Sequence, residues 1–247
     1  MFLTESAQEA LKNAQNICVL TGAGVSAESG IPTFRGEDGL WKKFRPEELA
    51  NIQAFMKNPE LVWEWYQFRR NIINEVEYNP GHVALAQWEN LHEHFTLVTQ
   101  NVDGLHRRAG NRNIVELHGN IMRNRCLKCG NVFETEEVYF KGKVPLCTCG
   151  GMLRPDVVWF GEMLQPEVIN KAFTASEEAD IFLSIGTSAI VYPAASLPEI
   201  AKSNGAFLIE INLEPTPLTP KADLFLEGLS GKILPELLKH WQDERTA

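Results

Sequence analysis

A short apolar run that leads directly into a glycine-rich turn is the feature that most limits how this chain can fold. Residues Ile17–Thr21 form the run, and the turn Gly22–Ala27 follows without a break. An apolar run without polar alternation is typical of a parallel strand that is covered on both faces. The turn has the spacing G-x-G-x-x-(G/A), in which glycines let the backbone approach a pyrophosphate and a following helix N-terminus supplies unpaired N–H groups.

This turn alone leaves two alternatives open. A tight strand-to-helix turn that binds no ligand would have the same glycines. The acidic residue that dehydrogenases carry about 20 positions further on is missing, and Gly30 and Pro32 prevent a long helix. The turn therefore predicts a bound dinucleotide but disfavours a hydride-transferring dehydrogenase.

Further apolar runs recur along the chain, with helical patterns between several of them. The expected strands are Ile17–Thr21, Phe95–Gln100, Ile114–Leu117, Ile181–Ile185, Ala206–Ile211 and Asp223–Leu226. The expected helices include Ser6–Ala14, His82–Leu91 and Pro166–Ala175. Alternation of this kind predicts the α/β class, with a doubly wound, parallel, Rossmann-like sheet.

Two stretches interrupt the alternation and predict a second, smaller domain. Residues 36–78 are rich in aromatic side chains and helical in pattern, whereas residues 121–155 contain four cysteines. We expect a helical insertion and a zinc-binding module that together form the small domain. The large, dinucleotide-binding domain would then comprise residues 1–35, 79–120 and 156–247.

Composition limits the partners of the chain. The 23 Lys and Arg residues against 32 Asp and Glu residues give a net charge of −9, which argues against a nucleic-acid partner. The long uncharged stretch from Ile181 to Pro198 is interrupted by Gly186 and Pro193, so no membrane span is expected. Without a signal-peptide pattern, we expect a cytoplasmic protein. The sequence leaves the oligomeric state open.

Four of the five cysteines lie close together in the sequence. Cys126 and Cys129 form one pair, and Cys147 and Cys149 form a second. Two close pairs can supply four thiolates to one tetrahedral, structural zinc ion. The C-x-C spacing of the second pair departs from the usual C-x-x-C, and redox thiols or an unligated cysteine remain alternatives. Cys18 lies within an expected strand and is most simply a core residue.

Polar side chains follow two of the expected central strands. Gln100, Asn101 and Asp103 come after one strand, and His118 comes after the next. Ligands of an open parallel sheet bind beyond the carboxyl ends of the strands. A histidine there, with a pKa of about 6.5, could act as a general base, although a lone histidine is more often structural. His106 lacks such a position and is expected to be structural or exposed.

An arginine lies where the sequence pattern expects an apolar residue. Asn58 and Pro59 predict the start of a helix that runs to about Val76. Arg69 projects from its apolar face, which otherwise comprises Val62, Trp65, Tyr66, Ile72, Ile73 and Val76. A buried guanidinium must meet an anion or extend to water. That anion could be an internal Glu or Asp, or a carboxylate that Arg69 and Tyr66 bind together.

Several motifs in order resemble the sirtuins, a family of NAD-dependent protein-lysine deacylases, over nearly the whole chain. The motifs are Gly22–Ser26, Pro32–Gly36, Thr99–Asp103, Leu117–Gly119, Gly186–Ser188 and Ile211–Glu214. The resemblance implies that NAD is the co-substrate and His118 the general base. It implies that the NAD site comprises Gly22, Ala23, Gly24, Ser26, Phe34, Arg35, Gln100, Asn101, Val102, Asp103, Gly186, Thr187, Ser188, Asn212, Glu214 and Ser230.

The resemblance also implies a reaction. The acyl-lysine oxygen would attack the nicotinamide ribose, nicotinamide would leave, and His118 would take a proton from a ribose hydroxyl. The products would be nicotinamide, O-acyl-ADP-ribose and free lysine. The partners would be acylated-lysine proteins or peptides.

Two further segments resemble substrate-binding parts of sirtuins. Tyr66 and Arg69 match the subgroup that removes succinyl, malonyl or glutaryl groups, in which these two residues bind the distal carboxylate. Residues Val157–Glu162 resemble the strand that pairs with the substrate backbone, which assigns Val158, Phe160 and Gly161 to peptide binding. Apart from the resemblance, this segment would be a core strand.

The sequence therefore favours an NAD-dependent protein-lysine deacylase that prefers acidic acyl groups. A plain deacetylase and a mono-ADP-ribosyltransferase are alternatives on the same scaffold. An alternative of another class is a zinc-ribbon adaptor with an inactive nucleotide pocket.

Overall fold

Six parallel strands form the central sheet of the computed structural model, which describes residues 3–33, 49–134 and 143–246. The strands lie in the order β3-β2-β1-β7-β8-β9, and every neighbouring pair is parallel. Their bounds are β1 (Ile17–Thr21), β2 (Phe95–Thr99), β3 (Ile114–Glu116), β7 (Ile181–Ile185), β8 (Phe207–Asn212) and β9 (Leu224–Glu227). The expected parallel sheet is confirmed, and the ends of each strand differ from the expected ends by no more than one residue.

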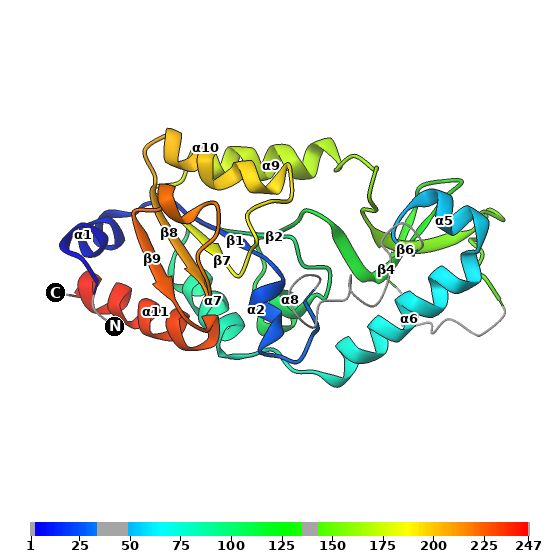
Figure 1. The fold of residues 1–247 in the computed structure, drawn as a ribbon, viewed down its shortest axis with the longest axis horizontal. Helices are drawn as coiled ribbons and strands as arrows, with labels where there is room; N and C mark the ends of the chain where they lie inside the picture. The colour runs from blue at the N-terminus through cyan, green and yellow to red at the C-terminus, as the bar shows by residue number, and fades with distance from the viewer. Residues whose placement is uncertain (1–2, 34–48, 135–142, 247) are drawn as a thin grey trace.

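Helices cover both faces of this sheet, as Figure 1 shows. One face carries α1 (Glu5–Asn13), α7 (Pro80–Leu91) and α11 (Ser230–Thr246), whereas the other carries α9 (Pro166–Glu177) and α10 (Leu197–Ser203). Alternate residues of β1 point to opposite sides, so Val19 belongs to the first core cluster and Cys18 to the second. Cys18 is thus a core residue, as expected.

Short elements connect the main strands and helices. They are α2 (Ala23–Ala27), α8 (Leu105–Ala109), η1 (Ala194–Ser196) and η2 (Thr219–Lys221). The strand order reverses at β1, which continues into α2. Strands β2 and β3 lie on one side of β1, whereas β7, β8 and β9 lie on the other side. A ligand site is expected at such a reversal, beyond the carboxyl ends of β1 and β7.

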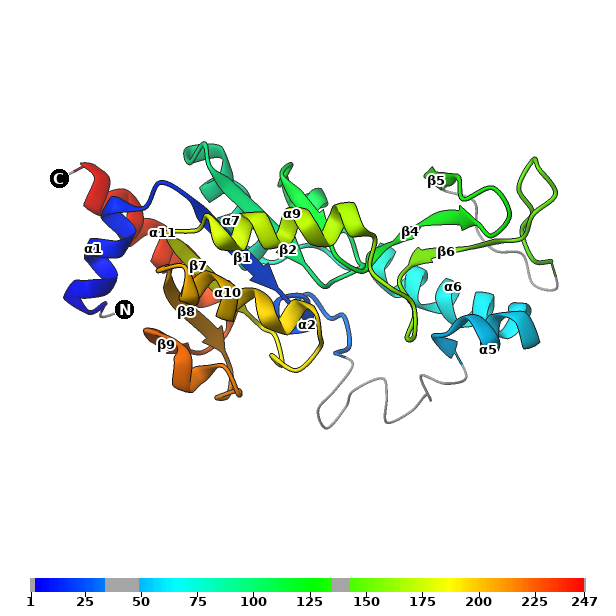
Figure 2. The same ribbon diagram turned by 90° about the horizontal axis from the view of Figure 1, so that it is seen from above.

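A smaller part of the molecule lies beyond one end of the central sheet (Figure 2). It contains α5 (Ile52–Lys57), α6 (Pro59–Glu75) and an antiparallel sheet of order β5-β4-β6, formed by β4 (Gly119–Cys126), β5 (Val132–Glu134) and β6 (Leu153–Val157). Both helices and this sheet share a third core cluster, which includes Phe55, Trp63 and Ile121. The two helices and the small sheet thus pack as one unit, and the sheet extends beyond residues 121–155 at both ends.

Helix α6 begins as the sequence predicts. The Asn58 side chain accepts a hydrogen bond from the Leu61 backbone N–H at 3.2 Å, and Pro59 occupies the first turn. The expected apolar face is only partly correct, because Ile72 and Val76 are half-buried. Arg70 is buried instead and is an internal arginine: its guanidinium donates to the Ile121 carbonyl oxygen at 2.7 Å.

The strand expected over residues 157–162 is wrong beyond its first residue. Strand β6 ends at Val157, and the chain then turns. The turn forms because the Trp159 backbone N–H donates to Glu162 Oε2 at 2.8 Å and the Phe160 N–H donates to the Ala50 carbonyl oxygen at 2.9 Å. These contacts use backbone groups that a longer strand would need for pairing.

Among the residues that the structure describes, no helix has both the length and the apolar character needed to cross a membrane.

Candidate active site

A cleft of about 1030 Å³ lies beyond the carboxyl ends of β1, β7 and β8 and extends to α6. It brings together most residues that the sequence nominates for NAD, substrate or proton transfer. The nominated residues that line it are Gly22, Ala23, Gly24, Tyr66, Arg69, Gln100, Asn101, Val102, His118, Val158, Phe160, Gly161, Gly186, Thr187, Ser188, Asn212, Glu214 and Ser230. Phe34 and Arg35 lie outside the described residues. Ser26 and Asp103 are buried just behind the lining.

The two glycine turns at the base of the cleft pack directly against each other. The Gly24 N–H donates to the Gly186 carbonyl oxygen at 2.9 Å. A Cβ atom at Gly22 or Gly24 would lie only 2.7 Å from a Gly186 backbone atom. These glycines are therefore required for the close approach of the β1 and β7 turns, in addition to any approach of a ligand.

A buried hydrogen-bonded chain supports the polar residues after β2. The Asn101 side-chain amide donates to the Gly22 carbonyl oxygen at 2.9 Å and to Ser26 Oγ at 3.1 Å. Ser26 in turn donates to Asp103 Oδ2 at 2.8 Å, and the Leu105 N–H donates to Asp103 Oδ1. Burial raises the pKa of Asp103, and these two hydrogen bonds act in the opposite direction. Ser26 and Asp103 thus position Asn101 and do not line the cleft themselves.

His118 lies at the junction of β3 and β4, in the wall of the cleft. Its Nδ1 is 3.0 Å from the Gln100 carbonyl oxygen. Because a carbonyl oxygen can only accept, Nδ1 carries the proton and Nε2 keeps a lone pair. Burial is the main cause that lowers the pKa of His118 from its usual 6.5, whereas the hydrogen bond with Gln100 raises it. The histidine is therefore a neutral base at pH 7, with a lower pKa than the sequence suggested.

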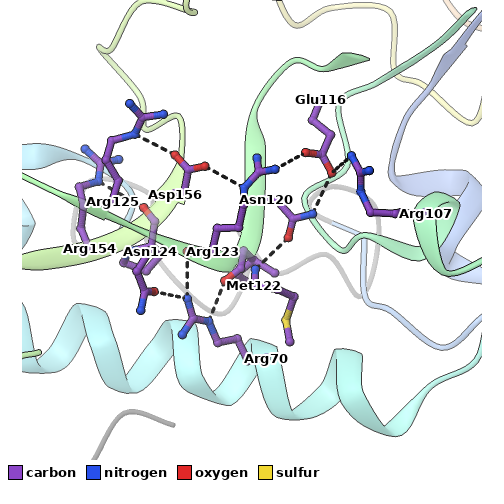
Figure 3. Close-up of polar contacts among 12 residues, drawn as sticks. Arg70, Arg107, Glu116, Asn120, Met122, Arg123, Asn124, Arg125, Arg154 and Asp156 are labelled. Carbon is purple, nitrogen blue, oxygen red and sulfur yellow. Dashed lines mark hydrogen bonds and ion pairs between the residues drawn. The ribbon is translucent and has the colours of Figure 1, made fainter. Parts of the chain in front are cut away.

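The turn that carries His118 is held from both sides. A Cβ atom at Gly119, whose φ is +79°, would lie 2.1 Å from the Asp156 carbonyl oxygen of β6, so only glycine fits there. Figure 3 shows Arg123 between two carboxylates that flank the turn. Arg123 contacts Glu116 at 2.9 Å and Asp156 at 3.0 Å. His118 is thus fixed between the central sheet and the small sheet.

Tyr66 and Arg69 lie one turn apart on α6, and both are buried while they line the cleft. Burial raises the pKa of Tyr66 and lowers the pKa of Arg69. The charge of Asp103 opposes the effect of burial on Arg69. The guanidinium also belongs to the wall of the cleft, so an internal acid and a bound carboxylate both stay as predictions for its anion.

The carboxyl ends of β8 and β9 supply polar groups on the far side of the cleft. The Asn212 side chain donates to the Thr187 carbonyl oxygen at 2.8 Å, which joins the turns after β7 and β8. Ser230 Oγ donates to Glu28 Oε1 at 2.7 Å, and the Gly231 N–H donates to the same oxygen. Glu28 lines the cleft but was missed from the sequence, because its partner lies 202 residues away and no local pattern indicates the contact.

Exposed apolar side chains lie where the sequence predicts peptide binding. Phe160 is 54% exposed and Met163 is 92% exposed, and both border the cleft. Tyr192, which is 71% exposed, borders it as well. Exposed apolar side chains beside a cleft are typical of a surface that binds a partner.

His106 is buried and structural. Its Nε2 lies 2.9 Å from Thr21 Oγ1, and its ring contacts that of His82, with 4.7 Å between the centroids.

The four clustered cysteines converge in the small sheet. Their sulfur atoms all lie within 4.8 Å of one another, with 3.5 Å between Cys126 and Cys149 and 3.8 Å between Cys129 and Cys147. These separations exceed a disulfide bond, which is about 2.0 Å long. Four thiolates about 2.3 Å from one tetrahedral zinc ion would lie about 3.8 Å apart. The cluster therefore fits one zinc ion, and its C-x-C half lies in place with the other pair.

Comparisons with known proteins agree with this geometry. The Sir2 family model matches residues 22–193. A protein of Archaeoglobus fulgidus named NAD-dependent protein deacylase 1 is 51% identical over 239 residues, which cover 96% of this chain and 98% of that protein. A Sir2 homologue solved in complex with NAD is 50% identical, with a TM-score of 0.92 and coverage of 98% and 95%. A Sir2 protein bound to a myristoylated histone peptide is 35% identical, with a TM-score of 0.78 and coverage of 98% and 97%.

Proposed function

The chain belongs to the Sir2 family, and from that premise we propose that it removes acyl groups from protein lysines with NAD as co-substrate. It prefers acyl groups that end in a carboxylate, such as succinyl and malonyl, and also removes acetyl. The observation that carries the preference is that Tyr66 and Arg69 line the same cleft as His118. The relatives named as deacylases and the homologue solved with NAD support the general reaction.

The cleft suits a dinucleotide in size and in chemistry. Its volume of about 1030 Å³ is ample for such a ligand. The glycine turns after β1 and β7 would face the phosphates, and Asn212 and Glu214 would bind ribose hydroxyls. Gln100, Asn101, Val102 and the supporting Ser26 and Asp103 would hold the nicotinamide side, and Phe34 and Arg35 are proposed to join them.

NAD supplies a ribose carbon that accepts the acyl oxygen as nicotinamide leaves. His118 accepts a proton at Nε2, because its Nδ1 proton is already donated to the Gln100 carbonyl oxygen. Val158, Phe160 and Gly161 hold the peptide backbone beside the cleft. Such main-chain contacts discriminate little between peptide sequences, so the acyl group is the main determinant of selectivity.

A buried arginine beside a tyrosine is better suited to bind a carboxylate than to bind a methyl group. Arg69 offers a planar set of N–H donors, and the cleft side of α6 brings the Tyr66 hydroxyl to the same end of the site. The negative charge of an acyl carboxylate would offset part of the cost of burying the guanidinium. Asp103 already contributes in this direction but is itself held by Ser26 and Leu105.

The test is a panel of lysine peptides that carry acetyl, butyryl, malonyl, succinyl, glutaryl or myristoyl groups, scored by nicotinamide release. Butyryl has the chain length of succinyl without its carboxylate, so the ratio of the two kcat/KM values isolates the contribution of the charge. Arg69→Met should lower kcat/KM for succinyl by on the order of 100-fold more than for acetyl or butyryl. Equal losses on both classes would show that the preference is wrong.

The same panel separates the alternatives. A plain deacetylase would favour acetyl over succinyl in the wild-type protein. A mono-ADP-ribosyltransferase would release nicotinamide without an acylated lysine and would label protein. An inactive adaptor would bind NAD without turnover, so loss of turnover in His118→Tyr with binding retained excludes it.

A further inference from the structure

One side-chain hydrogen bond at the acyl end of the cleft involves a residue to which neither the sequence patterns nor the proposed function assigns a role. Trp159 Nε1 donates to the Tyr66 hydroxyl oxygen at 2.7 Å. Both side chains are 2% exposed, so this contact is shielded from water. The two residues lie 93 positions apart and come from the turn after β6 and from α6. The contact therefore joins the proposed peptide-binding segment to the proposed acyl pocket.

The direction of this bond is fixed by chemistry. An indole N–H can only donate, so the Tyr66 oxygen is the acceptor. Within the described ranges, the Tyr66 hydroxyl makes this hydrogen bond alone. Because Tyr66 also lines the cleft, its own O–H can donate to an acceptor there. A bond received from Trp159 also polarises the phenol and strengthens it as a donor.

Contacts with neighbouring side chains fix the position of the Trp159 indole ring. The Arg154 guanidinium carbon lies 3.3 Å from its ring centroid, and the Phe55 ring lies 5.3 Å away. Arg154 pairs with Glu162, whose Oε2 also accepts from the Trp159 backbone N–H. The orientation of the N–H is thus set by packing and by charge before any substrate binds.

Two side chains at this end of the cleft therefore offer hydrogen-bond donors to a substrate. Tyr66 offers its O–H, and Arg69 on the next helical turn offers guanidinium N–H groups. We propose that Trp159 is a positioning residue for acyl selectivity: by donating to Tyr66, it directs the phenol proton toward the carboxylate of an acidic acyl group. This inference rests on the proposed preference for such groups and names the residue that makes Tyr66 a donor there.

The test removes the indole N–H and compares matched substrates. Trp159→Phe should lower kcat/KM for a succinyl-lysine peptide about fivefold more than for the butyryl-lysine peptide, mainly through a higher KM. In a Tyr66→Phe background, Trp159→Phe should no longer change the succinyl-to-butyryl ratio, because its partner oxygen is absent. The dissociation constant of the succinyl peptide, measured by fluorescence anisotropy, should rise by the same factor as KM.

A matched control is available in the same core. Trp63 is also buried, but its Nε1 donates to the Leu153 carbonyl oxygen at 3.1 Å and not to Tyr66. Trp63→Phe should leave the succinyl-to-butyryl ratio unchanged. If Trp159→Phe fails to fold, incorporation of benzothienylalanine at position 159 keeps the fused ring and replaces the N–H with a sulfur atom, which cannot donate. The same loss of ratio is expected with this residue.

The outcomes distinguish the role of Trp159 from the proposed preference for acidic acyl groups. Equal losses on succinyl and butyryl peptides in Trp159→Phe, or a ratio change that persists in the Tyr66→Phe background, would overturn the role of Trp159. If Arg69→Met still loses succinyl activity selectively in that case, the proposed function stands without it. If the wild-type protein does not prefer succinyl to butyryl, the proposed preference is wrong and the inference falls with it.

Discussion

His118 illustrates how a single hydrogen bond sets the chemistry of a residue. Its Nδ1 proton is committed to the Gln100 carbonyl oxygen, so Nε2 is the nitrogen that can accept a proton. The residue that supplies this carbonyl is itself a nominated member of the NAD site. The same backbone segment therefore places a polar side chain in the cleft and fixes the tautomer of the base.

The pH dependence of activity follows from the environment of His118. Since burial lowers its pKa, the neutral form that can accept a proton persists below pH 6.5. We predict that kcat/KM, measured by nicotinamide release across pH, falls on the acid side with an inflection below 6.5. His118→Ala should lose about a hundred- to ten-thousandfold in kcat while it still binds NAD. An acid inflection above 7 would contradict the assignment.

Two other histidines affect stability rather than catalysis. Burial lowers the pKa of His82 to about 4 and that of His106 well below its usual value. In the unfolded chain both take up protons near 6.5, so the unfolded state gains protons that the folded state refuses. Stability is therefore complete above 6.5 and is lost as the pH falls from there toward 4.

We predict that the free energy of unfolding decreases by about 3 kcal/mol over that range through His82 alone. Urea titrations at about pH 7 and about pH 4.5 measure the change. His82→Gln should make this pH-dependent loss of stability smaller. Glutamine can keep the contact with the Asn79 N–H at the start of α7, but it does not titrate. A pH dependence that is the same in this variant and in the wild-type protein would show that His82 is not the cause.

At the scale of secondary structure elements, Arg123 joins the two sheets. It lies on β4 and contacts Glu116 on β3 and Asp156 on β6 (Figure 3). Glu116 also accepts from the Asn120 side chain at 2.8 Å, so the turn that holds His118 is closed on both sides. Charge-assisted bonds of this kind are stronger than neutral ones.

We predict that Arg123→Met lowers the free energy of unfolding by about 2 kcal/mol, because two carboxylates each lose a partner. Arg125→Met is the matched control, since Arg125 contacts Asp156 at 2.8 Å and does not share in the Glu116 pair. Its loss should be about half as large. Both values come from urea unfolding at pH 7, and equal losses would show that the bond to Glu116 adds nothing.

The central elements could be predicted from the sequence because their signals are local. An uninterrupted apolar run marks a strand buried on both faces, as for Ile181–Ile185, and Asn58 with Pro59 marks a helix start. The small sheet gave no such signal. Strand β4 carries Arg123 and Arg125, whose charges are balanced by Asp156 on a strand about 30 residues later, so its pattern does not resemble that of a buried strand.

Some residues of the candidate site could likewise be predicted from local sequence signals, whereas others could not. Gln100, Asn101 and His118 could be nominated because each follows a strand, and parallel strands end at one edge. The contacts of Glu28 with Ser230 and of Trp159 with Tyr66 could not, because they join segments 202 and 93 residues apart. The turn after β6 could not be predicted either, because the backbone partner of Phe160, Ala50, lies in a distant segment.

At the scale of the whole molecule, residues at the carboxyl edge of the central sheet and on α6 of the smaller part line the same cleft. Residues of both parts therefore contribute to one site: His118 lies at the junction, and Arg69 lies on the helical side. A net charge of −9 on the whole chain would attract basic peptide segments and would repel a negatively charged acyl group. The positive charge of Arg69 would offset this repulsion locally.

The contrast between the negative net charge of the protein and the positive charge of Arg69 predicts how salt affects different substrates. Long-range attraction between the acidic protein and a peptide is screened over about 10 Å at 0.1 M salt, whereas the buried contact of an acyl carboxylate with Arg69 is screened much less. For a succinyl-lysine peptide flanked by lysines, kcat/KM should fall several-fold between about 0.05 and about 0.5 M NaCl. For the same peptide flanked by glutamates it should rise, while the succinyl-to-butyryl ratio within each series stays nearly constant. Steady-state assays of the four peptides provide the measurement. If both flanking series respond to salt alike, the net charge plays no part in substrate approach.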